Sequence, residues 1–330
     1  RWDDEQWLPG DGVVTGVGKV GGRTVCFLAN DFSVKAGTWG VQTIEKMIRI
    51  LERARALRVP IILLIDSAAG RLDEQHLSFA GRRHAGRIFH EVVRNSGVIP
   101  QISLLFGPSP AGSAYLPALT DALVMVDGHA TMYIGTPRMA EMVTGERVTY
   151  EELGGARMHC EVSGVGHKLV ASEEEAISWA RRWLGYLPDH WEEQPPQVEP
   201  RSARAGRPIT EIVPEQHSRP FDMYELIEQL IDEDSWLELS ELWAREVITG
   251  LARLEGQPLG VVANQPMVRG GVLFTDSADK VARFVWFCNA FNIPLLFLQD
   301  NSGFMVGTAE ERKGIIRHGA KMAWAVSSAT

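Results

Sequence analysis

The chain contains few cysteines, no excess of basic residues and no long apolar run. Of its 330 residues only Cys26, Cys160 and Cys288 are cysteines, and these three are far apart and form no C-x-x-C pair. This pattern argues against a zinc site or a disulfide framework, and it predicts a reducing, cytoplasmic location. The formal net charge of −9 argues against a nucleic-acid partner. Because the sequence has no run of about 18 apolar residues, we expect no membrane span.

Two common catalytic motifs are also missing. The sequence has no G-x-x-x-x-G-K-[ST], which argues against a P-loop nucleotide site. It has no G-x-S-x-G, and Ala111–Tyr115 fits a nucleophile elbow poorly. A serine hydrolase that uses Ser113 with His84 therefore stays a minor alternative. Hydrophobic residues at 45% and charged residues at 23% are typical of a globular protein, and the length is enough for two domains.

The sequence contains an internal repeat with a constant offset of 234 residues. At this offset Thr15–Gly22 matches Thr249–Gly256, with similar residues at corresponding places. Other matching pairs are Ala29–Asn30 with Ala263–Asn264, Val59–Leu63 with Ile293–Phe297, Asp66 with Asp300, and Arg83–Arg87 with Arg317–Lys321. A constant offset at turns and strand ends indicates two copies of one domain.

Each copy is predicted to be a layered α/β domain. In the first copy, Gly21-Gly22 predicts a hairpin turn, and the apolar stripe over Val41–Leu57 predicts an amphipathic helix. The apolar run Val59–Ile65 is typical of a central strand that is covered on both faces. Further predicted elements are the strands Val13–Val20, Thr24–Ala29, Ile102–Phe106 and Pro294–Leu298, the helices Pro137–Thr144, Met223–Ile231 and Ser277–Phe291, and helices capped by Ser172 and Asp222. Strands that alternate with helices indicate crossover connections in such a sheet.

Composition predicts the domain boundaries. Residues 188–210 are rich in Pro, Gln, Arg and Glu and have no apolar period, which is typical of a linker. We therefore expect an N-terminal domain over 1–187 and a C-terminal domain over 211–330. Because Thr330 corresponds to Ser96, we expect the second copy to be incomplete at its C-terminus.

Two turns of small residues are candidate sites because they follow predicted strands, where ligands of α/β sheets collect. One is Gly107–Ser113, after which Gly112, Ser113 and Ala114 are predicted to begin a helix. Small side chains there leave backbone N–H groups open to a ligand oxygen, as in an oxyanion hole, although a close-packed corner is an equal alternative. The other turn is Asp66–Arg71, with Asp300–Phe304 as its counterpart in the second copy.

Two charged residues of the turn Asp66–Arg71, which is the first loop in chain order, have open roles. Asp66 either caps the loop, the more common role at a strand end, or acts as a general base. Arg71 either holds a phosphate or pairs with Asp73 or Glu74. One N–H group from each loop would make a two-donor hole for a carbonyl oxygen that becomes negatively charged.

With these residues in view, the chain resembles the carboxyltransferase (beta) subunits of biotin-dependent acyl-CoA carboxylases, in the propionyl-CoA and methylcrotonyl-CoA carboxylase group. The matching stretches span nearly the whole chain. They include Asp66–Arg71, Gly97–Ser103, Ala114–Asp121, Val143–Glu146, Glu151–Ala156, Ser163–Val165, Val262–Pro266, Phe287–Pro294 and Ile315–Lys321.

The resemblance implies two tandem crotonase-like (ClpP/crotonase) domains and a carboxyl transfer from carboxybiotin to the α or vinylogous carbon of an acyl-CoA. It implies acyl-CoA on the N-terminal domain, carboxybiotin against the C-terminal domain of a dimer partner, and a hexamer built from dimers. The thioester enolate would be held by backbone N–H groups, with biotin on a biotin carboxylase or biotin carboxyl carrier subunit as the second partner. The resemblance implies no metal in this chain.

The site residues implied by the resemblance fall into three groups. Those expected to stabilise the enolate are Gly112, Ser113, Ala69 and Gly70. Those expected to bind substrate are Ser67, Ala68, Arg71, Ala111, Ala114 and Tyr115. Those expected on the biotin side are Asn301, Ser302, Gly303 and Phe304.

The chain also departs from the family pattern. The family usually has Asp-Ser-Gly-Gly-Ala-Arg where this chain has Asp66–Arg71, and a Gly-Gly pair where this chain has Gly112-Ser113. Lys35–Gly40 resembles the biotin-dependent decarboxylase subunits related to glutaconyl-CoA decarboxylase. A decarboxylase subunit, a crotonase-like hydrolase or isomerase without biotin, and a silent scaffold subunit therefore stay open as alternatives.

Overall fold

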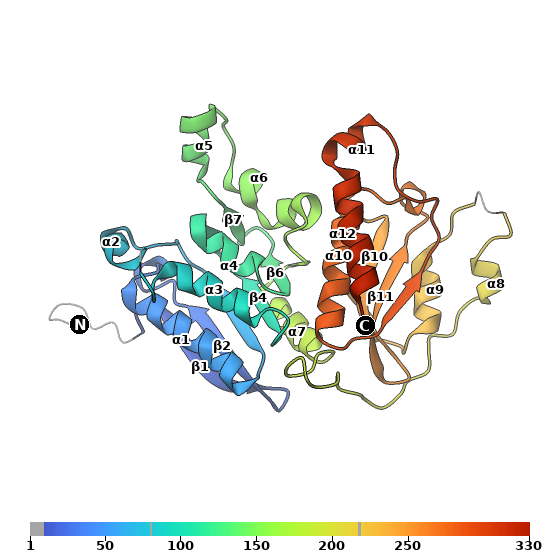
Figure 1. Cartoon of the computed structure of the whole chain (residues 1–330), viewed down its shortest axis with the longest axis horizontal. Coiled ribbons are helices and arrows are strands. Elements are labelled where there is room, and N and C mark those ends of the chain that lie inside the picture. The colour runs from blue at the N-terminus through green and yellow to red at the C-terminus, as the bar shows by residue number, and fades with distance from the viewer. Residues whose placement is uncertain (1–9, 80, 217–218) are drawn as a thin grey trace. The chain divides into compact units, whose positions relative to one another are not determined.

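The structure is a computed structural model that describes residues 10–79, 81–216 and 219–330 (Figure 1). The chain divides into two compact units, a first that ends at Arg181 and a second from Arg182 to Thr330. Both units combine helices with a sheet, so the predicted mixed α/β class is confirmed. No helix in the described part of the chain is long and apolar enough to cross a membrane.

The first unit is built on a six-stranded sheet with the order β1-β2-β3-β4-β6-β8. Its strands are β1 (Val13–Val20), β2 (Arg23–Asn30), β3 (Ile61–Ile65), β4 (Gln101–Leu105), β6 (Ala122–Val126) and β8 (Lys168–Val170). Only the β1–β2 pair is antiparallel, and the other pairs are parallel. Gly21 and Gly22 join β1 to β2 with φ of +57° and +83°, as a type I′ hairpin turn requires. The predicted hairpin is therefore confirmed.

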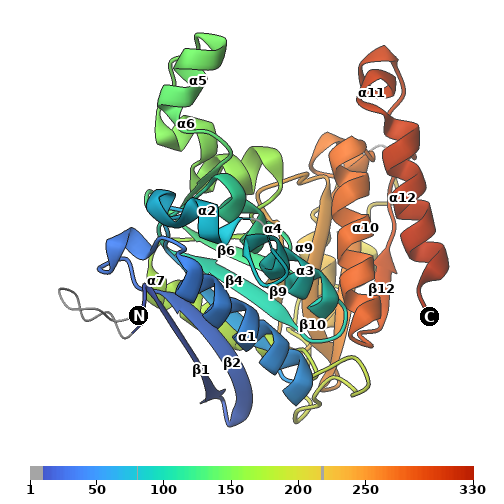
Figure 2. The same ribbon diagram turned by 60° about the vertical axis from the view of Figure 1, so that its left-hand side comes forward.

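Helices cover this sheet, and short elements extend from its carboxyl edge (Figure 2). The α-helices are α1 (Val41–Leu57), α2 (Gln75–Ser78), α3 (Ala85–Asn95), α4 (Tyr115–Ala118), α5 (Pro137–Thr144), α6 (Tyr150–Gly154) and α7 (Glu173–Leu184). The remaining elements are the 3-10 turns η1 (Lys35–Gly37), η2 (Leu72–Glu74) and η3 (Ala111–Ala114), the π-helical segment η4 (Met158–Ser163), and the paired strands β5 (Pro108–Pro110) and β7 (Thr131–Tyr133). Ser172 accepts a hydrogen bond from the Glu175 N–H at 3.2 Å, which confirms the predicted cap of α7.

The second unit has a four-stranded sheet with the order β12-β11-β10-β9. Its elements are α8 (Ile209–Ile212), α9 (Met223–Leu230), β9 (Leu237–Glu238), β10 (Val247–Leu254), β11 (Gln257–Asn264), η5 (Arg269–Gly271), α10 (Thr275–Ala290), β12 (Leu295–Leu298), α11 (Thr308–Lys313) and α12 (Ile315–Ser328). Helix α9 packs Met223 and Ile227 against Ile248 and Val261 of the sheet. The Asp222 carboxylate accepts a hydrogen bond from the Tyr224 N–H at 3.1 Å, so this predicted cap is also confirmed.

Backbone pairing repeats between the units at the offset seen in the sequence. Val13 pairs with Asn30 in the first unit, and Val247 pairs with Asn264 in the second. The parallel pair Cys26–Ile61 likewise corresponds to Gly260–Leu295. The 3-10 turns η1 and η5 and the isolated bridges Trp39–Gly70 and Leu273–Phe304 follow the same offset.

The segment 188–210 packs on the second unit. Arg253 donates to the Pro196 carbonyl at 2.8 Å, and the Val198 N–H donates to the Gly256 carbonyl at 3.1 Å. This proline-rich stretch is therefore part of the second unit and lies along its surface. The boundaries 1–187 and 211–330 stay predictions.

The helix expected after Gly107–Ser113 is shorter than the sequence suggested. It consists of the single 3-10 turn η3 followed by α4, which has only four residues. Aligned peptide dipoles add up over several turns, so the contribution expected from a helix dipole is corrected to a small one. Any N–H donors at this turn must act through direct hydrogen bonds.

Candidate functional site

The two predicted loops meet at one edge of the first sheet. Strands β3 and β4 are parallel neighbours, so the loops that follow them leave the sheet side by side. The Ser67 N–H donates to the Pro108 carbonyl at 2.8 Å, which joins one loop directly to the other. A site that uses both loops is therefore geometrically consistent.

In the first loop one backbone donor is left over. Gly70 forms a parallel bridge with Trp39, in which Trp39 N–H donates to Ala69 O at 2.8 Å and Arg71 N–H donates to Trp39 O at 3.0 Å. The Ala68 N–H donates to Ala36 O at 3.0 Å, and the Ala69 N–H donates to the Ser67 hydroxyl at 3.2 Å. Among the described residues, nothing accepts a hydrogen bond from the Gly70 N–H. Gly70 is thus the donor of this loop that is available to a ligand.

The second loop offers one similar donor. Within the described ranges, the N–H group of Gly112 at the start of η3 has no hydrogen-bond partner. Ala111 and Gly112 are exposed, whereas Ser113 is buried. The Ser113 hydroxyl donates to the Pro110 carbonyl at 2.6 Å, so this side chain is held within its own turn. That contact argues against Ser113 as a nucleophile.

An alanine in the left-handed conformation precedes the available donor in each loop. Ala69, with φ of +69°, precedes Gly70, and Ala111, with φ of +54°, precedes Gly112. This conformation is unfavourable for a residue with a Cβ and is concentrated at functional sites in folded proteins. The strain therefore marks both turns as more than close-packed corners.

The side chains of Ser67 and Arg71 contact the protein itself. Ser67 is buried, and its hydroxyl donates to the Gly37 carbonyl at 2.8 Å. Arg71 is 7% exposed and pairs with Glu74 at 2.8 Å and with Asp11 at 3.0 Å. Burial opposes ionisation, but Glu74 and Asp11 more than offset it and raise the pKa of Arg71. Of the two predicted roles for Arg71, the structure favours the pairing with Glu74.

The Asp66 carboxyl group does not cap the loop. In the described part of the chain it accepts no hydrogen bond from residues 67–71; instead it lies against Gly107, where an added Cβ would be 2.1 Å from Oδ1. Burial, with a smaller effect from Glu173, raises the pKa of Asp66. The structural role expected from the sequence is therefore corrected: Asp66 requires a glycine at position 107.

The other predicted substrate-binding residues differ in exposure. Ala68 is exposed, and Tyr115 is 53% exposed with its ring edge-on to Phe89 at 6.5 Å between centroids. Ala114 is buried and contributes only to the packing of η3. Ala68, Ala111 and Tyr115 are thus the exposed residues of this group.

The second unit repeats the first loop at Asp300–Phe304. Leu273 N–H donates to Gly303 O at 3.0 Å and Met305 N–H donates to Leu273 O at 2.8 Å, as Trp39 does with its neighbours in the first unit. The Gly303 N–H donates to the Asn301 side chain at 2.7 Å. Within the described part of the second unit the Phe304 N–H has no acceptor, and Phe304 corresponds to Gly70. Ser302 is exposed.

Sequence reasoning missed the turn at 35–39, which supports the first loop. Ala36 accepts the hydrogen bond of Ala68, and Trp39 pairs with Gly70. Lys35 and Ala36 both have positive φ, of +47° and +53°. The available signal was the repeat itself, because Ala36 corresponds to Gly270, which has φ of +65°. No group of three or more metal-ligating side chains occurs in the part of the chain that the structure describes.

Comparison with known proteins identifies the family to which this chain is related. The carboxyl transferase domain matches residues 2–330. An uncharacterised carboxylase of Bacillus subtilis (strain 168) is 58% identical over 98% of this chain and 63% of its own length. A propionyl-CoA carboxylase carboxyltransferase subunit of Haloferax mediterranei is 44% identical over 99% of this chain and 63% of its own length.

A solved structure agrees with these relatives. Transcarboxylase 12S, whose hexamer was solved with methylmalonyl-coenzyme A and methylmalonic acid bound, superimposes with a TM-score of 0.92 at 39% identity, covering 97% of this chain and 62% of that one. The chain thus spans slightly less than two thirds of the length of the curated relatives it matches. The match over residues 2–330 shows that this chain belongs to the carboxyl transferase domain family.

Proposed function

We propose that this chain is the carboxyltransferase component of a biotin-dependent acyl-CoA carboxylase. Membership of the carboxyl transferase domain family supports this proposal. The observation that carries it is the pair of adjoining loops that leave the N–H groups of Gly70 and Gly112 without acceptors among the described residues. Two such donors fit a thioester oxygen that gains negative charge.

The mechanism that we propose uses the backbone as its main catalytic group. When bound, carboxybiotin would supply the carboxyl group that is transferred and, once that group has left, the base that accepts the α-proton. Gly70 and Gly112 donate hydrogen bonds to the thioester oxygen, and these bonds strengthen as the α-carbon loses its proton and the oxygen becomes negative. Loss of one such donor costs other enzymes roughly 3–4 kcal/mol of transition-state stabilisation. Ala68 and Tyr115 lie on the outward side of the same loops and would contact the acyl-CoA.

We infer that the two units arose by duplication of one crotonase-like domain and divide the reaction between them. The constant offset of the strand registers supports this inference. The first unit would hold the acyl-CoA, and Asn301–Phe304 of the second would face biotin. Biotin would arrive on a biotin carboxyl carrier or biotin carboxylase subunit, and the assembly would be a hexamer, as in the transcarboxylase 12S structure.

The test is a partial reaction that needs no partner protein. The purified protein is incubated with malonyl-, methylmalonyl- or methylcrotonyl-type carboxylated CoA thioesters, with free biotin as the carboxyl acceptor. We expect loss of the carboxyl group that depends on biotin for at least one thioester. The absence of biotin-dependent loss from all of them would overturn the proposal.

Ser113→Ala separates the carboxyltransferase from a serine hydrolase. The substitution removes the hydroxyl but keeps the N–H group, so the proposal predicts a turnover number close to that of the unaltered protein. Abolished activity with a folded protein would instead indicate that the hydroxyl is the nucleophile. The comparison requires melting curves of both proteins, because the lost bond to Pro110 also lowers stability.

A further inference from the structure

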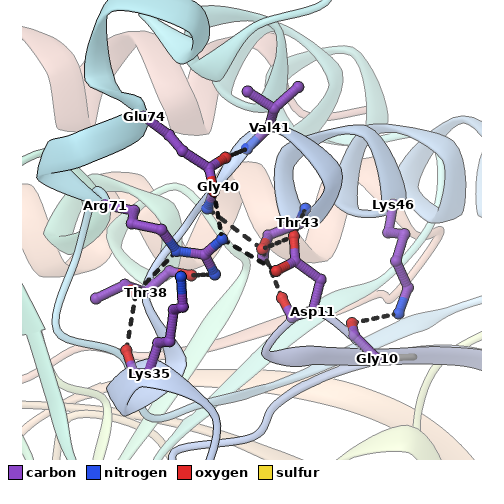
Figure 3. Close-up of polar contacts among 10 residues, drawn as sticks. All are labelled: Gly10, Asp11, Lys35, Thr38, Gly40, Val41, Thr43, Lys46, Arg71 and Glu74. Carbon is purple, nitrogen blue, oxygen red and sulfur yellow. Dashed lines mark hydrogen bonds and ion pairs between the residues drawn. The ribbon is translucent and has the colours of Figure 1, made fainter. Parts of the chain in front are cut away.

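Arg71 is at the centre of a buried polar cluster next to the first loop (Figure 3). Its Nη1 lies 3.0 Å from Asp11 Oδ1 and 2.8 Å from Glu74 Oε1. Its Nη2 donates to the Thr38 carbonyl at 3.2 Å. Two carboxylates neutralise one guanidinium, so the cluster has no spare positive charge for a substrate phosphate. The structural role of the cluster therefore depends on which parts of the chain Arg71, Asp11 and Glu74 connect.

Both carboxylates are also bound to the N-terminus of helix α1. The other oxygen of Glu74 accepts a hydrogen bond from the Val41 N–H at 2.8 Å, and Asp11 Oδ2 accepts one from the Thr43 N–H at 3.0 Å. These N–H groups have no partner within the helix and favour a negative charge. Each carboxylate therefore links the Arg71 side chain to the rigid end of α1.

The guanidinium packs closely against the backbone of Gly40. A Cβ on Gly40 would lie 2.2 Å from Arg71 Nη1 and 2.7 Å from Glu74 Oε2. Gly40 is the residue immediately before α1, so its missing side chain makes room for the cluster. The Arg71 backbone is fixed as well, by its bond to Trp39 O at 3.0 Å.

The second unit lacks this cluster although it repeats the loop. At the offset of 234, Arg71 corresponds to Met305, Asp11 to Arg245, Glu74 to Thr308 and Gly40 to Phe274. Met305 is 41% exposed and has no charge. The buried ion-pair cluster is thus a property of the first loop and not of the shared fold.

We propose that Arg71 is a positioning residue that fixes the direction of the Gly70 N–H group toward the substrate by bridging Asp11 and Glu74. This inference rests on the carboxyltransferase function proposed above. Arg71 follows Gly70 directly, so a shift of the Arg71 backbone moves Gly70 and, with it, the Ala69–Gly70 peptide that carries the donor. A displacement of about 1 Å at a catalytic group can cost about 100-fold in rate. The corresponding loop of the second unit, Asp300–Phe304, has no such cluster and would need a less exact alignment of its N–H donor.

The experiment compares four single variants and one double variant by kcat and KM in the partial reaction with free biotin. Arg71→Met copies the residue of the second unit, and Arg71→Lys keeps the charge but cannot bridge both carboxylates with a planar fork. Gly40→Ala displaces the guanidinium without removing a charge. Arg83→Met is the matched control, because Arg83 also bridges two carboxylates of α1, Glu45 and Glu52, but is 44% exposed and outside the loop.

We expect kcat to fall by about 100-fold in Arg71→Met and Gly40→Ala, with KM changed by less than about five-fold, because the oxygen contact matters most in the transition state. The kcat of Arg71→Lys should lie between that of these variants and that of the unaltered protein. The kcat of Arg83→Met should equal that of the unaltered protein. The double variant Arg71→Met with Gly40→Ala should lose no more than either alone, because both act through one cluster. If Arg71→Met does not fold, Gly40→Ala and Arg71→Lys provide the same comparison.

Amide hydrogen exchange tests the cluster without any assay of activity. In the Arg71 variants and in Gly40→Ala, the N–H groups of Trp39 and Arg71 should exchange faster, because both are bonded across the loop. Unchanged exchange, or a folded Arg71→Met with kcat within about three-fold of the unaltered protein, would overturn the inference. Faster exchange in the variants of a protein that performs no carboxyl transfer would leave the cluster standing and refute the proposed function instead.

Discussion

Replacing Ala69 with glycine tests whether the first loop stores backbone strain. Ala69 has φ of +69°, a conformation that costs an L-residue roughly 1–2 kcal/mol relative to glycine. Its counterpart Gly303 is a glycine with φ of +114°. Glycine at position 69 would remove the steric cost but would make the unfolded chain more flexible, which costs about 0.4–1 kcal/mol. The difference predicts that Ala69→Gly raises the free energy of unfolding by about 0.8 kcal/mol.

The assay is urea unfolding, supported by thermal melting. A gain of that size should raise the melting temperature by roughly 2–3 °C for a unit of this length. Ala56→Gly is the control, because Ala56 is exposed on helix α1, where glycine costs about 0.5–1 kcal/mol. Each substitution deletes one methyl group, but we expect the two changes in the free energy of unfolding to have opposite signs. If Ala69→Gly destabilises the protein as much as Ala56→Gly does, the strain argument is refuted.

Two further predictions concern buried groups. Burial lowers the pKa of Lys280 from 10.5 to about 8, so between these values the unfolded chain binds more protons than the folded one. The free energy of unfolding should therefore rise with pH across that window, and urea unfolding at about pH 8 and about pH 10 should show that Lys280→Met loses this rise; an equal rise in both proteins would contradict the assignment. Gly107→Ala would place a Cβ 2.1 Å from Asp66 Oδ1, and we expect it to lower the free energy of unfolding by about 1–3 kcal/mol. Wild-type stability on urea unfolding would show that Asp66 moves aside freely.

Much of the fold was predictable because its signals are local. The apolar stripe of Val41–Leu57 gave the bounds of α1 without error, and Gly21-Gly22 marked the hairpin turn. The offset of 234 predicted that the strand registers of the two units would correspond, as they do. The length of the helix after η3 was not predictable from its small residues: α4 ends at Ala118 after one turn, and the Thr120 hydroxyl donates to the Pro117 carbonyl at 2.7 Å.

The candidate site was predictable as two loops but not as particular atoms. Small residues after buried strands indicated where a ligand could approach the backbone. They did not indicate that the N–H groups of Ala68 and Ala69 are occupied and that the Gly70 N–H is left over. That outcome depends on Ala36, Trp39 and the Ser67 hydroxyl, whose contacts with the loop arise only when the chain has folded.

The sequence by itself determined helix α1, the β1–β2 hairpin and the internal repeat, since apolar periodicity and turn residues act over a few neighbouring positions. Tertiary structure alone decided that Arg71 pairs with Asp11, which lies 60 residues away in the chain. It also decided which donors face outward, because a backbone N–H group has the same chemistry at every residue except proline. Only its surroundings in the folded chain make one of them free to bind a ligand.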